Sequence, residues 1–202
     1  MKSKQKYSKI RVGVALLAFL LLPLAAHAEP GALFFSEYVE GSAFNKAVEV
    51  HNASAAPVDL AAEGYRIEIY FKGKEKPGRV ISLEGVLDAS DSLVIAHGRA
   101  ADTLRQRADA LSGALTFNGD DTVVLRNRER VVDRIGQAGF DPGESWMVAE
   151  VGTKDGTLRR KGSVCRGDAL ASDPFDPSAE WERLPKDTFG GLGEHRSRCG
   201  DR

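Results

Sequence analysis

The stretch Tyr65-Arg66-Ile67-Glu68-Ile69-Tyr70-Phe71 decides the fold class. Tyr65, Ile67, Ile69 and Phe71 occupy alternate positions, and two charged residues lie between them. Because successive side chains of a β-strand point to opposite faces, this period of two predicts a half-buried strand. The chain is therefore expected to build its core from sheets.

The same period extends to other segments rich in β-branched and aromatic residues. These further predicted strands cover residues 32–39, 47–51, 80–83, 92–96, 122–125 and 131–135. The last two are separated by the charged run 126–130, which predicts a hairpin. Residues 100–111 are rich in Ala, Leu and Arg, so we expect a short helix that ends at Gly113. Many short strands and one short helix predict an all-β, antiparallel sandwich, and the chain after Gly136 reads as irregular.

The N-terminus has the features of a secretion signal. Five basic residues precede the apolar run 12–24, and Ala26-His27-Ala28 supplies small residues for cleavage. The apolar run is shorter than the roughly 20 residues that a membrane-spanning helix needs. We therefore expect residues 1–28 to be removed and residues 29–202 to be exported, to the periplasm or the medium, without a transmembrane anchor.

Removal of the signal would make the protein more acidic. The whole chain has a net charge of −1, and the signal contains five basic residues and no acidic ones. The mature chain would therefore carry about −6, whereas proteins that bind nucleic acid through their overall field are usually basic. Any nucleic-acid site would have to be a local patch.

Both cysteines lie near the C-terminus, at Cys165 and Cys199. In an oxidising compartment such a pair usually forms one disulfide. The bond would close a loop of about 35 residues, which the chain-entropy model values at about 3–4 kcal/mol. A zinc pair or a nucleophile is disfavoured, because the cysteines lack the arrangement of neighbouring histidines that either chemistry needs.

Seven segments in order resemble one family. The first reads Phe34-Phe35-Ser36-Glu37-Tyr38-Val39-Glu40-Gly41-Ser42, and the fourth reads Val132-Asp133-Arg134-Ile135-Gly136. The other five are residues 45–50, 117–125, 157–161, 175–181 and 187–195. Together they resemble the lamin-tail domain (LTD), in particular the version carried by secreted bacterial nucleases of the endonuclease/exonuclease/phosphatase superfamily.

The resemblance implies an immunoglobulin-like β-sandwich over about residues 31–195. Because only seven residues of this sequence follow His195, we expect no counterpart of the catalytic domain of those nucleases, and none of its catalytic residues is carried over. We expect a non-catalytic protein without a cofactor, whose partner is a protein or an envelope component, with DNA as a further possibility. Fold alone does not fix the function.

Two groups of acidic residues are weak candidates for chemistry. Glu37 and Glu49 lie in the two opening strands and could act as acid and base or hold a cation. Alternatively they point to solvent or pair with Lys46 or an arginine. Asp120 and Asp121 follow Asn118-Gly119 and could bind Ca²⁺, but this is also ordinary turn chemistry. A further acidic cluster comprises Asp173, Asp176 and Glu180.

Three groups of basic residues are candidates for binding, because Lys and Arg neutralise phosphates. The groups are Lys72, Lys74, Lys76 and Arg79; Arg126, Arg128 and Arg130; and Arg159, Arg160 and Lys161. Tyr70 and Phe71 beside the first group could add a stacking platform for a single strand. The alternative is that these are solvated loops, which is the commoner outcome.

The sequence is compatible with three functions, which the structure can help to distinguish. The first is an exported binding module. The second is a DNA-binding accessory to a separately encoded secreted nuclease, which requires the three basic groups to share one surface. The third is a small hydrolase, which requires Glu37 and Glu49 to meet the Asp120-Asp121 turn in one pocket. The histidines lack a metal-binding spacing and are interpreted as surface or turn residues.

Overall fold

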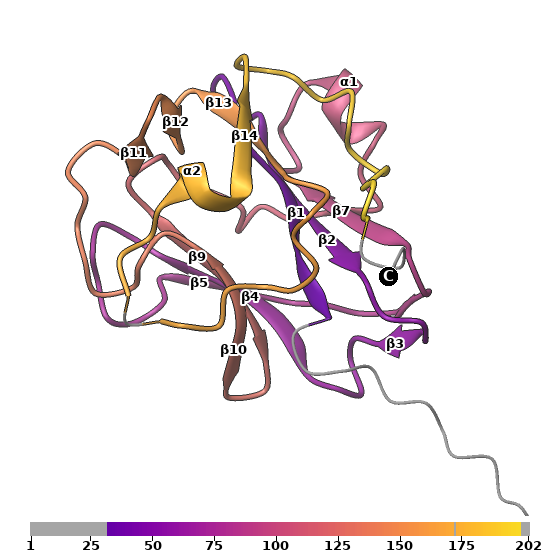
Figure 1. Cartoon of the computed structure of the whole chain (residues 1–202). Helices are drawn as coiled ribbons and strands as arrows, with labels where there is room; N and C mark the ends of the chain where they lie inside the picture. Colours follow the sequence, from indigo (N-terminus) through magenta and orange to yellow (C-terminus); the bar gives the residue numbers. More distant parts are fainter. Residues whose placement is uncertain (1–31, 172, 199–202) are drawn as a thin grey trace, which may run out of the picture.

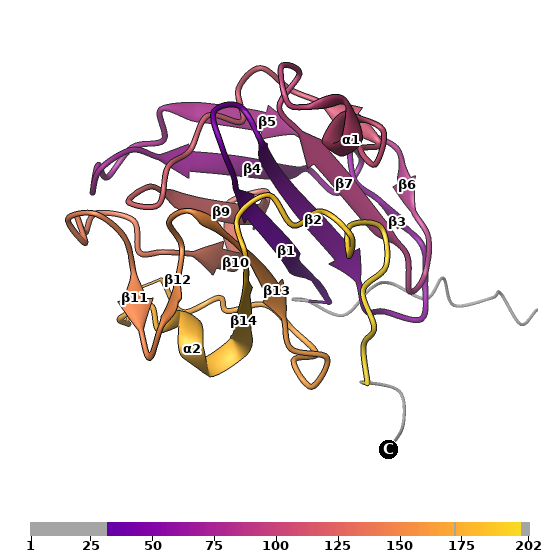
Figure 2. The same ribbon diagram turned by 90° about the horizontal axis from the view of Figure 1, so that it is seen from above.

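A computed structural model describes residues 32–171 and 173–198 of the chain. The predicted signal peptide and Cys199 lie outside the described residues, so cleavage and the Cys165–Cys199 disulfide stay predictions. The described part is a two-layered sandwich of a larger and a smaller sheet (Figures 1 and 2). The expected all-β, immunoglobulin-like sandwich is confirmed.

The larger sheet has six strands in the order β14-β13-β1-β2-β7-β8. All its pairs are antiparallel except the short parallel pair of β7 with β8. The strands are β1 (Leu33–Glu40), β2 (Lys46–Asn52), β7 (Ser92–Ala96), β8 (Ala110–Leu111), β13 (Gly156–Arg160) and β14 (Trp181–Leu184). A bulge between Phe35 and Glu37 interrupts the register of β1 with β2.

The smaller sheet has four antiparallel strands in the order β10-β9-β4-β5. They are β4 (Tyr65–Tyr70), β5 (Arg79–Ser82), β9 (Thr122–Asn127) and β10 (Arg130–Ile135). The alternation in β4 is confirmed, because Tyr65, Ile67 and Ile69 belong to the core between the sheets and Phe71 packs against it. The predicted hairpin is the β9–β10 pair, and its strands extend to Asn127 and Arg130.

Two short sheets and two helical turns complete the described chain. The sheets pair β3 (Val58–Asp59) with β6 (Val86–Leu87), and β11 (Met147–Val148) with β12 (Val151–Gly152). The helices are α1 (Asp102–Arg105) and α2 (Pro177–Glu180). The helix predicted over 100–111 is therefore only one turn, and its end at Gly113 was wrong. Residues 110–111 form β8 instead, because Asp109 accepts the backbone N–H of Val94 and aligns the chain beside β7.

The region after Gly136 is more regular than the sequence indicated. β13 lies between β1 and β14, so this part of the chain completes the larger sheet. Trp146 and Trp181 are both buried in the main core and anchor the long connections. No helix in residues 32–171 and 173–198 is long and apolar enough to cross a bilayer.

A second, smaller apolar cluster lies on the outer face of the larger sheet. Leu104 from the α1 segment and Leu192 near the C-terminus pack there against Val39, Ala47 and Val94. Figure 2 shows the C-terminal segment, in yellow, passing across β1 and β2. The sandwich is therefore covered on this side by two segments, and the side chains beneath them are removed from water.

Candidate functional site

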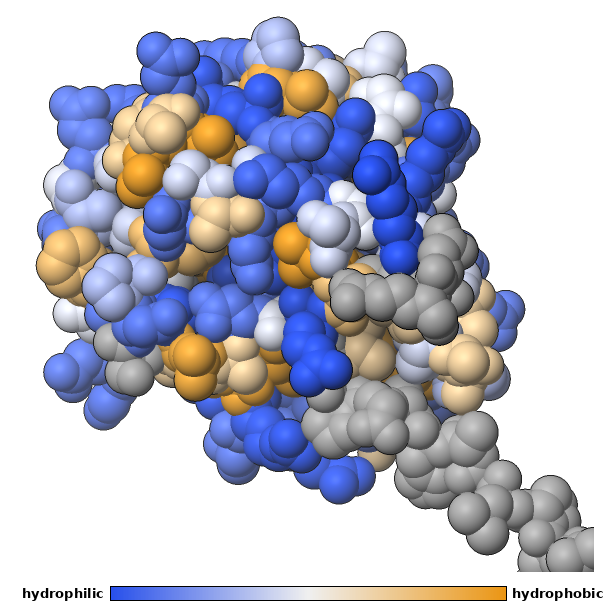
Figure 3. Space-filling view, viewed as in Figure 1, coloured by the Kyte–Doolittle hydropathy of each residue, from blue (hydrophilic) through white to orange (hydrophobic). Residues whose placement is uncertain are grey.

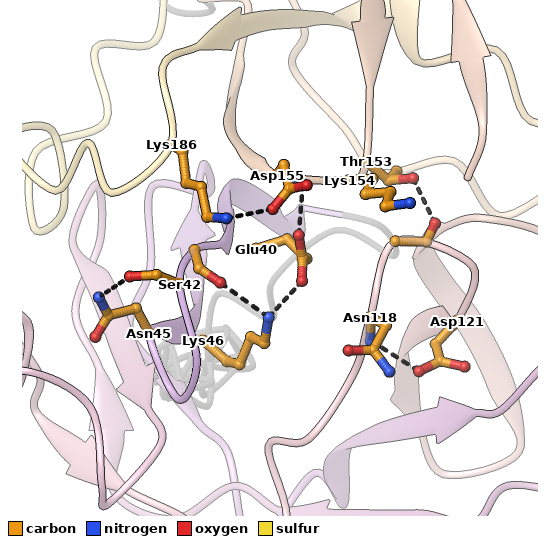
Figure 4. Close-up of polar contacts among 12 residues, drawn as sticks. Glu40, Ser42, Asn45, Lys46, Asn118, Asp121, Thr153, Lys154, Asp155 and Lys186 are labelled. Carbon is orange, nitrogen blue, oxygen red and sulfur yellow. Dashed lines mark hydrogen bonds and ion pairs between the residues drawn. The ribbon is translucent and has the colours of Figure 1, made fainter. Parts of the chain in front are cut away.

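A polar cleft of about 340 Å³ opens at the end of the sandwich where β1 ends, and we call it the end cleft (Figure 4). It is lined by Glu40, Lys72, Asn118, Gly119, Asp120, Gly143, Glu144, Lys154 and Asp155. Glu40 is the last residue of β1, and the others come from four separate turns, at residues 72, 118–120, 143–144 and 154–155.

Most charges of the end cleft are already paired. Glu40 forms a buried ion pair with Lys46 and also accepts the backbone N–H of Asp155. Asp155 in turn pairs with Lys186 at 2.5 Å. Lys154 pairs with Glu144 at 2.9 Å. This network fixes the turns to one another.

The calcium candidates Asp120 and Asp121 lie at this cleft but have different surroundings. Asp121 is buried, and its carboxylate accepts the backbone N–H groups of Lys72 and Asn118 at 3.1 and 2.8 Å. Burial raises the pKa of Asp121. Asp120 lines the cleft, with the Lys72 ammonium 3.8 Å away. Across the described ranges no group of three or more His, Cys, Asp or Glu is arranged to hold a metal ion.

The later acidic residues have separate structural roles. Asp173 pairs with the buried Arg134. Asp176 caps helix α2 by accepting the N–H of Ser178 at 2.8 Å. Glu180 pairs with Arg160 at 2.8 Å. The three carboxylates are thus divided between three different partners.

The first basic group lies beside the end cleft, on an exposed turn that ends at Arg79, the first residue of β5, and we call residues 72–79 the lysine loop. Lys72, Lys74, Lys76 and Arg79 are all exposed. Gly73, at φ +66°, lies against the backbone of Phe140, and the N–H of Gly139 donates to Lys74 O at 3.3 Å. Phe140 is 52% exposed, so an aromatic ring lies at the side of the loop. Tyr70 is buried, and the stacking platform expected from it is wrong.

The second basic group lies at the opposite end of the smaller sheet. Tyr70, before the lysine loop, is paired with Thr122, whereas Tyr65 is paired with Asn127 at the hairpin turn. Five residue steps of about 3.3 Å put roughly 17 Å between these ends.

Arg126, in the second basic group, belongs to an ion-pair network with Glu68. Its Nε donates to Glu68 at 2.7 Å, and Arg66 and the hydroxyl of Tyr70 also donate to this carboxylate. Burial alone would raise the pKa of Glu68, but these three donors outweigh it and lower the pKa.

The third basic group belongs to the larger sheet and is mostly occupied. Arg160 is fully buried and donates to both carboxylate oxygens of Asp133 in β10, at 3.1 and 3.2 Å. Arg159 pairs with Glu37 at 3.2 Å. Lys161 donates to the carbonyl oxygens of Ser178 and Ala179. The three basic groups therefore do not form one surface.

Glu37 and Glu49 lie directly opposite each other in the β1–β2 register, on the covered face of the larger sheet. They are 2% and 1% exposed, and burial raises the pKa of both. Glu49 accepts hydrogen bonds from Ser36 and from the backbone N–H of Gly193. The predicted pairing with an arginine is confirmed for Glu37, which pairs with Arg159. The prediction that these carboxylates point to solvent is wrong for both. Neither residue lines the cleft that Asp120 lines.

Two histidines that were read as surface residues lie beside this pair. His51 and His195 have ring centroids 4.7 Å apart, and both rings contact Phe34 edge-on. Burial lowers the pKa of His51 and lowers that of His195 to about 4, to which the charges of His51, Arg160 and Arg159 add. His51 and His97 are buried, so the surface interpretation is wrong for these two, whereas His195 is partly exposed. The sequence carries no signal for these contacts, because Phe34 and His195 are remote in the chain.

The family model of the lamin tail domain matches residues 26–139. The chain belongs to the lamin tail domain family. Among curated proteins, none matches the chain. The lamin tail domain is a non-catalytic β-sandwich that often serves as an interaction module. Strands β13 and β14 lie beyond the matched residues and are nevertheless part of the larger sheet.

Proposed function

We propose that this lamin-tail-domain protein is an exported, non-catalytic binding module that contacts an anionic protein or envelope component through its lysine loop. The observation that carries the proposal is the exposure of four cationic side chains within the lysine loop. Lys72 is 71% exposed, and its ion pair with Asp120 is long, at 3.8 Å. Exposed loops on a rigid sandwich are the usual place for binding residues.

The surroundings of the loop support a contact with a surface rather than with a small substrate. Phe140 adds an exposed aromatic ring beside Lys74, and Val80 at the start of β5 is 50% exposed. On the face shown in Figure 3, hydrophobic side chains form small separate patches among hydrophilic ones. A contact that combines charge with a few apolar side chains suits an anionic partner.

The test measures binding of the mature chain, residues 29–202, to vesicles of phosphatidylcholine with phosphatidylglycerol, and to single- and double-stranded DNA, at several salt concentrations. We expect vesicle binding that weakens steeply with salt, because exposed charges are screened. Lys74→Glu with Lys76→Glu should abolish it. The matched control is Arg128→Glu with Arg130→Glu, the same change of charge at the opposite end of the smaller sheet.

Each outcome has a clear meaning. Loss of vesicle binding in the lysine-loop variant alone supports the proposal. Equal losses in both variants would show that only net charge matters and would contradict a role for the loop. Binding to DNA but not to vesicles would favour the accessory of a nuclease instead.

A further inference from the structure

A second cleft, which we call the C-terminal cleft, lies at the other end of β13 from the end cleft. Gly156 of β13 is paired with Glu40 at the end cleft, whereas Arg160 at the far end of β13 reaches Phe35 O. The C-terminal cleft has a volume of about 490 Å³. It is lined by Arg159, Arg160, Lys161, Gly162, Glu182, Gly190, Gly191, Glu194, His195, Arg196, Ser197 and Arg198.

Two remote segments are packed backbone to backbone to form its walls. The N–H of Arg198 donates to Gly162 O at 2.8 Å. A Cβ on Gly162 would lie 2.5 Å from Arg196 O, so only glycine permits this approach. Gly191 lies directly on the guanidinium of Arg159. The glycines thus hold the C-terminal segment close enough for its arginines to lie beside Lys161.

The lining of the cleft is basic, although the chain as a whole is slightly acidic. Five of its residues are Lys or Arg and two are Glu. Arg159 and Arg160 are paired with carboxylates. Lys161 donates only to backbone carbonyls, and the ion pairs found among the described residues include neither Arg196 nor Arg198. Three cationic groups are therefore free of an acidic partner in this part of the structure.

A neutral polar group lies in the same wall. The Nε2 atom of His195 is buried and has no hydrogen-bond partner among residues 32–171 and 173–198. Buried polar atoms are nearly always hydrogen-bonded, so this nitrogen is available to a water molecule or to a ligand. Because His195 lines a basic cleft, an N–H at this position would donate to an anionic ligand bound there.

We propose that the C-terminal cleft binds the phosphate of a small phosphate monoester, with Lys161, Arg196 and Arg198 as its cationic donors. Guanidinium groups form paired hydrogen bonds with phosphate oxygens, and an ammonium adds a compact charge. A phosphate presents several acceptor oxygens in different directions, which suits donors from two separate walls. The site is independent of the lysine loop and goes beyond the proposed function. The monoester is either a soluble compound or a lipid headgroup.

Calorimetry with inorganic phosphate, on the mature chain at low salt, tests the site. We expect Arg196→Gln with Arg198→Gln to weaken phosphate binding by at least about tenfold. Lys74→Gln with Lys76→Gln, which removes the same charge from the lysine loop, should leave it unchanged. Both pairs are exposed, so thermal unfolding should be similar in the two variants and in the wild type.

Vesicles containing phosphatidic acid distinguish the two sources. The ligand is a lipid headgroup if the wild type binds phosphatidic acid more tightly than phosphatidylglycerol and the Arg196 and Arg198 variant loses this preference. Binding of inorganic phosphate without that preference identifies a soluble monoester. Failure of the wild type to bind phosphate at low salt, or an equal loss in both variants, would overturn the proposal. Neither result would affect vesicle binding by the lysine loop, which is tested with different residues.

Discussion

Arg160 and Asp133 form a fully buried ion pair that joins the two sheets of the sandwich. The guanidinium of Arg160 in β13 donates to both carboxylate oxygens of Asp133 in β10. Asp133 also accepts the backbone N–H groups of Phe35 and Asp168, both at 2.7 Å. The carboxylate therefore connects β10 with β1, with β13 and with the loop after β13. Burial raises the pKa of Asp133, although the four hydrogen bonds to its carboxylate act to lower it.

Asp133→Ala should destabilise the protein by about 3–5 kcal/mol, because the buried Arg160 would keep only the partly exposed Glu180 as its carboxylate partner, and the backbone N–H groups of Phe35 and Asp168 would lose their acceptor. The measurement is urea unfolding of the two proteins. Asp102→Ala is the matched control, since its ion pair with Arg105 is exposed and should contribute less than about 1 kcal/mol. A loss for Asp133→Ala as small as that of the control would contradict a structural role for the pair.

Gly191→Ala should cost about 1–3 kcal/mol, because the added methyl group meets the guanidinium of Arg159 and displaces it from the buried Glu37. Gly190→Ala is an internal control, since a Cβ there has nothing within 4 Å. Thermal unfolding of both variants checks the difference. Equal melting temperatures would show that Arg159 can move without cost.

The strands that alternate cleanly could be predicted from the sequence, but β13 could not. Its inward side chains are Leu158, in the core, and Arg160, in the buried ion pair. An arginine at an inward position breaks the apolar alternation, so the segment reads as a charged loop. Its partner Asp133 lies in another strand, and no local pattern connects the two.

The candidate sites show the same limit. The basic groups could be found in the sequence, but their availability depends on remote partners, such as Glu68 for Arg126 and Glu37 for Arg159. The C-terminal cleft was missed because it forms only when residues 190–198 return to the end of β13. Gly162 and Gly191 were local signals of close approaches there, of Gly162 to the backbone of Arg196 and of Gly191 to the side chain of Arg159.

The protein should lose stability as the pH falls from about 6.5 towards 4 because of His195. Its pKa is lowered to about 4 in the folded protein, chiefly by burial. The unfolded chain, with an ordinary pKa near 6.5, therefore binds a proton first, and acid favours unfolding. NMR titration of the His195 ring checks the pKa directly, and a midpoint near 6.5 would contradict its burial.

The pH dependence of stability that His195 causes can be separated from the one that the two buried glutamates cause. Burial raises the pKa of Glu37 and Glu49, so the folded state binds their protons more readily and their contribution has the opposite sign. Both glutamates stay in His195→Gln, so a comparison with the wild type isolates the histidine. We expect the variant to lose less stability between pH 6.5 and pH 4 in urea unfolding. An identical loss in the two proteins would assign the acid sensitivity to other groups.

The predicted Cys165–Cys199 disulfide has a structural rationale in the hydrogen bond between Arg198 N and Gly162 O. This contact brings the residue before Cys199 close to a residue three positions before Cys165. Cys165→Ser with Cys199→Ser should therefore lower stability by about 3–4 kcal/mol under oxidising conditions, and a reductant should lower that of the wild type by a similar amount. Thiol titration of the unfolded, unreduced protein provides the check, because two free thiols would contradict the bond. Since Arg198 is next to Cys199, the double variant should also weaken phosphate binding, whereas vesicle binding by the remote lysine loop should persist.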